Sequence, residues 1–201
     1  MLFILNGKME VVDTLSNDGD LSEITPFFDD EYKQYLSTGT DTFTFSTMAN
    51  TRESEHLVVG NYIAFMYKDK ERLFHITEIE ETHDKEFTKT VYCETAGIEL
   101  INEIIRPMAM NSVSLTRFLS SVLSETEWEV GFVDASLTDV HDININNYPS
   151  VYSTLQEHVV GTYGGEISFT CKLQGGRLSK KYVNVYARRG NVNGYRFEYS
   201  S

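Results

Sequence analysis

The spacing of apolar residues changes along this chain, from a repeat of two to a repeat of 3.6. Before about residue 95 the pattern alternates, as in residues 42–46 (TFTFS), which places both phenylalanines on one strand face. Further on, a helical stripe is formed by apolar side chains three and four positions apart: Leu115, Phe118, Leu119, Val122 and Leu123. We therefore expect an α+β fold with two units, residues 1–95 and 96–201, and a boundary within residues 93–97.

The first unit is expected to be a small β-barrel or sandwich. Residues 62–67 are typical of a buried strand that follows a turn at Gly60 and Asn61. Residues 72–79 would return as a hairpin partner after the polar connection 68–71, and residues 86–93 would add a third strand. Another turn is expected at residues 17–20. Several short strands joined by polar turns favour a barrel or a sandwich.

The second unit mixes helices and strands. The stripe predicts a helix that begins at Ser112 or Ser114 and packs against the unit's own sheet, with Trp128 nearby. A second helix would begin at Pro149 or Ser150 and end at residues 164–165, and a shorter one would begin at residues 97–100. Strands are expected at residues 128–133, 166–173 and 182–187, with a turn at 175–176. Residues 195–199 are typical of a strand that the chain cuts short, so we expect a fragment of a longer protein.

Charge and cysteine content narrow the class of protein. Thirty acidic and seventeen basic side chains give a formal net charge of −13, which argues against a sequence-independent grip on nucleic-acid phosphates. Cys93 and Cys171 are isolated and are expected to be buried, reduced thiols. The apolar start, residues 1–5, is too short for a signal peptide or a membrane span. We expect a soluble protein made in a reducing cytoplasm.

A search for catalytic and metal-binding patterns predicts none. The sequence lacks HExxH, a P-loop and GxGxxG, and its five histidines lack ligand spacing. His75 is interpreted as a strand residue. The acidic turn at 17–20 fails as a calcium loop, because Thr14 and Thr25 stand where the first and last carboxylates must be. The prediction is therefore no catalytic, cofactor-binding or metal-binding residue, and no enzyme activity in this chain.

Weaker alternatives remain open at this point. Cys171 and His158 could act as nucleophile and base, and the acidic residues of one strand end could serve glycoside hydrolysis, although a solvated edge is the commoner explanation. Those acidic residues are Glu78, Glu80 and Glu81. A second acidic set is interpreted as loop polarity: Asp134, Asp139 and Asp142. The pair Arg188 and Arg189 is too small for a phosphate-binding patch. The twelve Phe and twelve Tyr residues could fill cores, or form a sugar-stacking platform.

Several segments, taken in order, carry a resemblance to a known family. They are residues 57–65 (LVVGNYIAF), 74–79 (FHITEI), 91–100 (VYCETAGIEL), 119–131 (LSSVLSETEWEVG), 153–155 (STL) and 164–169 (GGEISF). The pattern resembles the prophage tail endopeptidase family, also described as phage minor structural or tail-associated lysin proteins. It covers about residues 55–200, and each segment alone is a weak signal. Their order and spacing together carry the resemblance.

The resemblance implies a baseplate hub in which two barrel domains frame an inserted α+β domain, and three subunits form a ring. It implies a structural role at the virion tail tip, closing the tail channel and contributing to host attachment and DNA passage. The distal tail protein and the tape measure protein would be neighbours, after assembly in the host cytoplasm. Some family members carry a C-terminal hydrolase, and this sequence ends before it. Two rival functions remain: a peptidoglycan hydrolase and a carbohydrate-binding module.

Overall fold

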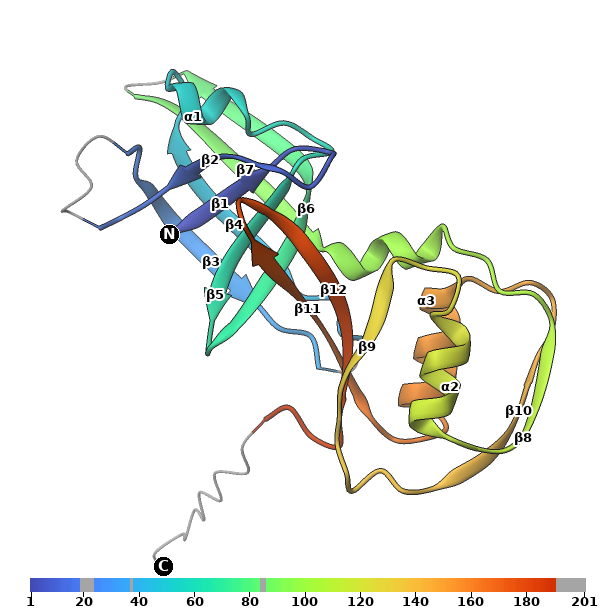
Figure 1. Cartoon of the computed structure of the whole chain (residues 1–201). Helices are drawn as coiled ribbons and strands as arrows, with labels where there is room; N and C mark the ends of the chain where they lie inside the picture. Colours follow the sequence, from blue (N-terminus) through green and yellow to red (C-terminus); the bar gives the residue numbers. More distant parts are fainter. Residues whose placement is uncertain (19–23, 37, 84–85, 191–201) are drawn as a thin grey trace, which may run out of the picture.

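The chain folds mostly into β-strands, as the computed structural model shows for residues 1–18, 24–36, 38–83 and 86–190 (Figure 1). The first half holds β1 (Leu2–Leu5), β2 (Val11–Leu15), β3 (Phe27–Lys33), β4 (Thr42–Met48), the short α1 (Arg52–Glu55), β5 (Tyr62–Tyr67), β6 (Lys70–His83) and β7 (Phe87–Thr95). The second half holds the 3-10 helix η1 (Ala96–Ile101), β8 (Met108–Ser114), α2 (Leu115–Val122), β9 (Trp128–Val133), β10 (Val140–Ile145), α3 (Val151–Leu155), the π-helical η2 (Gln156–Val160), β11 (Glu166–Gln174) and β12 (Arg177–Tyr186). The helices are short, so the predicted α+β class holds only loosely.

The first unit is a curled antiparallel sheet built around the long strand β6. This strand pairs with β5 as far as His75 and with β7 from Phe74 onward, and its register shifts between Ile76 and Glu78. A bulge of this kind bends a strand and increases its twist. β7 then pairs with β4, β4 with β3, and β5 with β1 and β2. The sheet therefore wraps around one hydrophobic core, which includes Phe43, Phe45, Phe65, Phe74, Ile76 and Val91.

The second unit places two helices between strands. In Figure 1, α2 and α3 lie between β9 and the two-stranded ribbon of β8 and β10. The β11–β12 hairpin continues the main sheet, because β12 pairs in parallel with β9 and Cys171 on β11 pairs with Glu71 on β6. One ten-stranded sheet thus runs through both halves of the chain.

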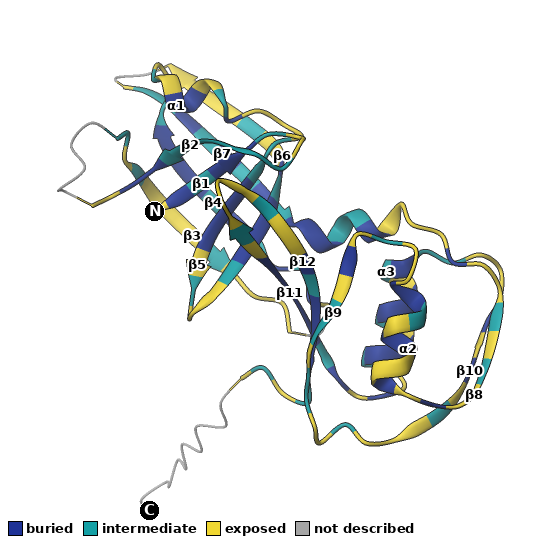
Figure 2. Cartoon of the chain, viewed as in Figure 1, coloured by how far each residue is buried: buried dark blue, intermediate teal, exposed yellow. Residues whose placement is uncertain are grey.

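The predicted helical stripe is confirmed as a buried face. Its five residues are each at most 4% exposed: Leu115, Phe118, Leu119, Val122 and Leu123. Figure 2 shows the ribbon of α2 with both buried and exposed segments, as an amphipathic helix requires. Trp128 lies in the same core, edge-on to Phe169 with 5.2 Å between the ring centroids. The stripe therefore holds α2 against the second unit's strands.

The division between residues 95 and 96 stays a prediction. The strand β7 ends at Thr95 and η1 begins at Ala96, where the spacing of apolar residues changes. Two separate hydrophobic cores exist, but the second also takes Leu5, Ala64 and Leu73 from the first unit. The shared sheet and this shared packing mean that the two halves are closely joined.

Several predicted elements differ in detail from the structure. The helix expected at residues 97–100 is a 3-10 helix, and Ser114 precedes α2 without a side-chain capping bond. Ser150 does cap α3, since its hydroxyl accepts the N–H of Ser153 at 3.1 Å. The helix then widens into η2 and ends before Gly161 rather than at 164–165. The strand expected at 195–199 lies outside the described residues.

Gly97 leaves no room for a side chain. A Cβ atom at this position would meet the ring of Phe169 at 2.4 Å, within the second core. Gly97→Ala should therefore lower the free energy of unfolding by about 1–3 kcal/mol, because the ring must shift in a packed site. Gly7→Ala is the matched control, since nothing lies within 4 Å of its Cβ position. Urea denaturation of both variants checks this, and equal midpoints would contradict it.

Candidate functional site

Two of the three acidic residues singled out on β6 are engaged across the strand pair. Glu81 forms an ion pair with Lys89 at 3.0 Å, and Glu80 accepts a hydrogen bond from the Tyr92 hydroxyl at 3.4 Å. Glu78 is exposed at the bulge. These partners belong to the sheet itself, and this favours the solvated-strand interpretation over a pair of catalytic carboxylates.

The second acidic set is spread over a turn, a strand pair and an exposed position. Asp134 accepts hydrogen bonds from the N–H and the hydroxyl of Ser136, at 3.0 and 2.8 Å, and these bonds lower the pKa of the Asp134 carboxyl. Asp142 accepts the Ser112 N–H at 2.7 Å, where Ser112 has a φ of 47°. Asp139 is exposed. Asp134 thus shapes a turn, whereas Asp142 joins strand β10 to the bulged part of strand β8.

The cysteine and histidine proposed as a nucleophile and base are not joined. Cys171 is 6% exposed on β11, and burial raises the pKa of its thiol to about 12. His158 packs edge-on against Phe118, and its Nδ1 lies 3.4 Å from the Thr162 hydroxyl oxygen. No hydrogen bond connects Cys171 and His158 within the described ranges. A nucleophilic cysteine usually has a lowered pKa and a base within hydrogen-bond reach, and the arrangement here offers neither. Burial raises the pKa of Cys93 as well.

Arg189, which the sequence presents as half of a small charge run, forms a buried ion pair. Its Nη2 lies 2.9 Å from Oδ2 of Asp41, and the two side chains are only 6% and 5% exposed. Arg189 also donates to the Ile167 carbonyl at 2.9 Å, and the Tyr32 hydroxyl donates to Asp41 at 2.8 Å. This cluster ties the segment before β4 to β11 and to the residues that follow β12.

A second ionic cluster joins η1 to β9 and β12. Lys181 Nζ lies 2.5 Å from Glu99 and 3.1 Å from Glu127, and Trp128 Nε1 donates to Glu99 at 2.8 Å. Burial disfavours the ammonium, but the two carboxylates outweigh that effect and hold the pKa of Lys181 above its usual value. Trp128, the one tryptophan of the sequence, is 4% exposed, so its ring is too buried to stack on a sugar at the surface.

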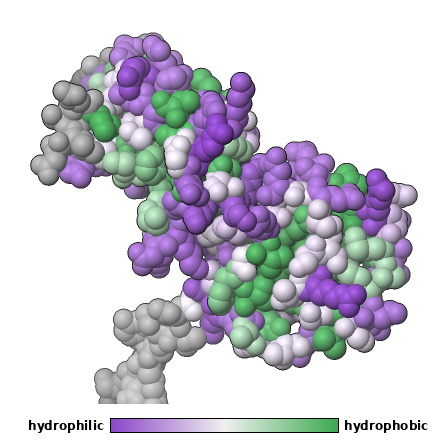
Figure 3. Space-filling model, viewed as in Figure 1, coloured by the Kyte–Doolittle hydropathy of each residue, from purple (hydrophilic) through white to green (hydrophobic). Residues whose placement is uncertain are grey.

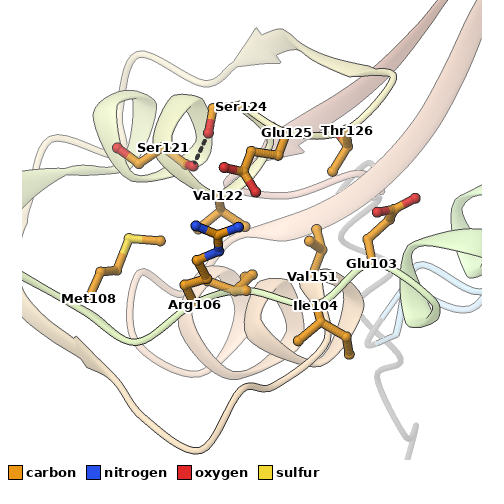
Figure 4. A pocket seen from close by; sticks show the side chains of 11 residues that line it. Glu103, Ile104, Arg106, Met108, Ser121, Val122, Ser124, Glu125, Thr126 and Val151 are labelled. Carbon is orange, nitrogen blue, oxygen red and sulfur yellow. Dashed lines mark hydrogen bonds between the residues drawn. The ribbon is translucent and has the colours of Figure 1, made fainter.

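A small cavity of about 150 Å³ lies between residues 103–108 and the end of α2 (Figure 4). Arg106 and Glu125 point into it, without an ion pair between them in the described part of the chain. The hydroxyls of Ser121 and Ser124 donate to helix carbonyls at 3.0 and 2.9 Å. Among the described residues, no hydrogen bond joins either hydroxyl to the carboxylates of Glu103 and Glu125, which also line the cavity.

Apolar side chains reach the surface at several places. Figure 3 shows them in patches over the unit with α2 and α3, whereas hydrophilic atoms dominate the region between the units. Those with exposed fractions of 49–63% are Met1, Tyr35, Val59, Met66, Ile104, Phe132, Val140 and Tyr148. No group of three or more metal-type ligands is found in the ranges that the structure describes. Within those ranges no helix is long and apolar enough to cross a bilayer.

Comparison with known proteins identifies the fold. The chain is similar to prophage tail protein gp18 from Listeria monocytogenes EGD-e, with a TM-score of 0.57 and 13% identity over 100% of this chain and 56% of that one. It is also similar to the tail protein from Neisseria meningitidis MC58, with a TM-score of 0.53 and 10% identity over 78% of this chain and 44% of that one. No family model and no curated protein matches the sequence. The chain spans about half the length of these two solved structures and shares their fold.

Proposed function

We propose that this chain is a structural component of a bacteriophage tail, in the baseplate hub at the tail tip. The observation that carries the proposal is the fold shared with a prophage tail protein along the whole chain. The fold alone does not fix a function, so the proposal also rests on the site. Most of the residues weighed for catalysis take part in contacts within the fold, as Glu81 does with Lys89 and Asp134 with Ser136, and this supports the proposal.

In this proposal the chain has a mechanical role. It would help to close the tail channel, contribute to host attachment and open for DNA passage, with the distal tail protein and the tape measure protein as neighbours. The buried pair Asp41–Arg189 and the Lys181 cluster join segments that are far apart in the sequence. Such links would help the chain to keep its fold when the tail is under mechanical force. The net charge of −13 would keep DNA phosphates from adhering to the chain during passage. Assembly would take place in the host cytoplasm.

Zymography of the purified chain on bacterial cell walls separates this role from a peptidoglycan hydrolase. We expect no lytic band, because the candidate Cys171 is buried and has no hydrogen bond to His158 among the described residues. A lytic band that persists after Cys171→Ala would place catalysis elsewhere in the chain, and one that disappears would restore the cysteine alternative. Either band would overturn the non-enzymatic role.

We also propose that the protein containing this chain forms a homotrimer, whereas the chain by itself associates weakly. Cyclic closure requires two complementary surfaces on each subunit, and the resembling family places one of them on a further barrel. The charge of −13 adds repulsion between copies, most strongly at low salt. Light scattering at low and high salt should give a mass near 23.0 kDa in both. A stable trimer in both conditions would show that this chain carries a complete interface.

A further inference from the structure

A basic pocket of about 160 Å³ lies where the turn between β5 and β6 meets β11 and β12. Four of its lining side chains are cationic, and none is a carboxylate. The residues that line the pocket are Gln34, Tyr67, Lys68, Lys70, Arg72, Ser168, Tyr186 and Arg189. The chain as a whole has thirty acidic and seventeen basic residues. A pocket with this charge therefore differs from the rest of the molecule. We propose that it binds the carboxylate of an acidic segment of a partner polypeptide.

Arg72 is a buried cation without a carboxylate partner. It is 8% exposed, and its Nη1 donates to the Ser168 hydroxyl at 2.7 Å and to the Phe169 carbonyl at 3.0 Å. Its Nε has no acceptor, and within the described residues no ion pair joins Arg72 to an acid. A buried charge without a counter-charge is costly, so an anion in the pocket would stabilise it. Arg189 differs, because Asp41 already balances its charge.

Two exposed lysines stand at this pocket. Lys70 donates to the Tyr186 hydroxyl, and its Nζ lies 4.7 Å from the ring centroid of Tyr186. Lys68 lies over Tyr67 at 5.2 Å, in a turn where Lys68 and Asp69 have φ values of 47° and 59°. Neither lysine has an ion pair in the part of the chain that is described. Both ammonium groups are therefore available to an incoming carboxylate.

Three acids that contact or adjoin the lining residues do not fill this role. Asp41 is bound to Arg189, and Glu71 accepts the Leu173 N–H at 2.8 Å. Asp69 does not line the basic pocket but belongs to the adjoining hollow. The surplus positive charge of the pocket therefore remains without a partner from these three residues.

The surface beside the pocket indicates what kind of molecule carries the carboxylate. Lys70 also lines the adjoining hollow, together with Met66 and Phe132, which are 60% and 49% exposed. Phe132 stands on β9, which ends the order of paired strands in the main sheet. Among the described residues β9 pairs with β12 on one side only, and a strand edge with apolar side chains beside it is suited to an extended peptide. The partner is therefore expected to be a polypeptide with an acidic residue beside apolar ones, rather than a polymer of phosphates.

The test is a calorimetric or NMR titration of the whole chain with acetyl-Phe-Glu-Phe-amide, its glutamine analogue and inorganic phosphate, at constant ionic strength. We expect the glutamate peptide to bind with a Kd on the order of 1 mM, and the glutamine peptide about tenfold more weakly. The double variant Lys68→Met/Lys70→Met should bind the glutamate peptide about tenfold more weakly. Lys8→Met, the control, removes one such positive charge at an exposed site outside this pocket and should leave the Kd unchanged within about twofold.

Other outcomes would overturn the proposal. Equal affinity for the glutamate and glutamine peptides would show that charge is not recognised. If phosphate binds more tightly than the glutamate peptide, and the double variant no longer binds phosphate, the pocket is a site for a free oxyanion. Weakening in Lys8→Met equal to that in the double variant would indicate only diffuse attraction. No binding of either peptide at about 10 mM would remove the site altogether.

Discussion

Leu119→Ala is expected to lower the free energy of unfolding by about 2–5 kcal/mol, the range for a large-to-small change in a packed core. Leu119 is fully buried on α2, within a core that also contains Phe118 and Trp128. The alanine leaves a cavity that the surrounding strands and helices can fill only in part. Urea denaturation followed by the fluorescence of the buried Trp128 measures the change.

Thr116→Ala is the control for that measurement. Thr116 is on the same helix but exposed, so its substitution should change the free energy of unfolding by less than about 0.5 kcal/mol. If Leu119→Ala lowers the free energy of unfolding by less than about 0.5 kcal/mol, the stripe is loosely packed or is buried fully only when another chain binds.

Asp41→Ala is expected to cost about 3–5 kcal/mol, because it leaves the Arg189 guanidinium buried without its counter-charge. The two side chains are 5% and 6% exposed and their atoms lie 2.9 Å apart. Glu129→Ala is the matched control, since it breaks the pair Glu129–Lys180, whose side chains are 52% and 45% exposed. That exposed pair should contribute only about 0–1 kcal/mol.

A second variant separates a lost ion pair from general disruption. Asp41→Ala combined with Arg189→Met removes both charges, so the double variant should recover part of the stability lost by Asp41→Ala alone. If Asp41→Ala costs no more than Glu129→Ala, the buried pair does not hold the two segments together.

The strands with clear apolar alternation or an unbroken apolar run could be predicted from the sequence. Residues 62–67 and 128–133 form β5 and β9 with the predicted bounds, because turn residues or a change of period mark both ends. The strands β8 and β10 were missed. β8 buries only Val113 and leaves most of its other side chains exposed, so local alternation gives little signal. The pairing of β8 with β10 forms the ribbon instead.

The interactions that join the two units could not be predicted from the sequence. Asp41 and Arg189 are 148 residues apart, and nothing local distinguishes them from exposed acids and bases. Arg72 is buried by residues far away in the sequence, because its guanidinium donates to Ser168 and Phe169 on β11. The second helix was predicted too long, because the change to π-helical winding at Gln156 leaves no mark in the apolar spacing.

Immunogold electron microscopy tests the central claim most directly. Antibodies against this chain would be applied to phage particles released by the bacterium that carries its gene. The tail-tip proposal predicts gold at the distal end of the tail, and none on the capsid. Label on the capsid, or particles that carry no label while the chain remains in the cell lysate, would contradict a structural role in the tail.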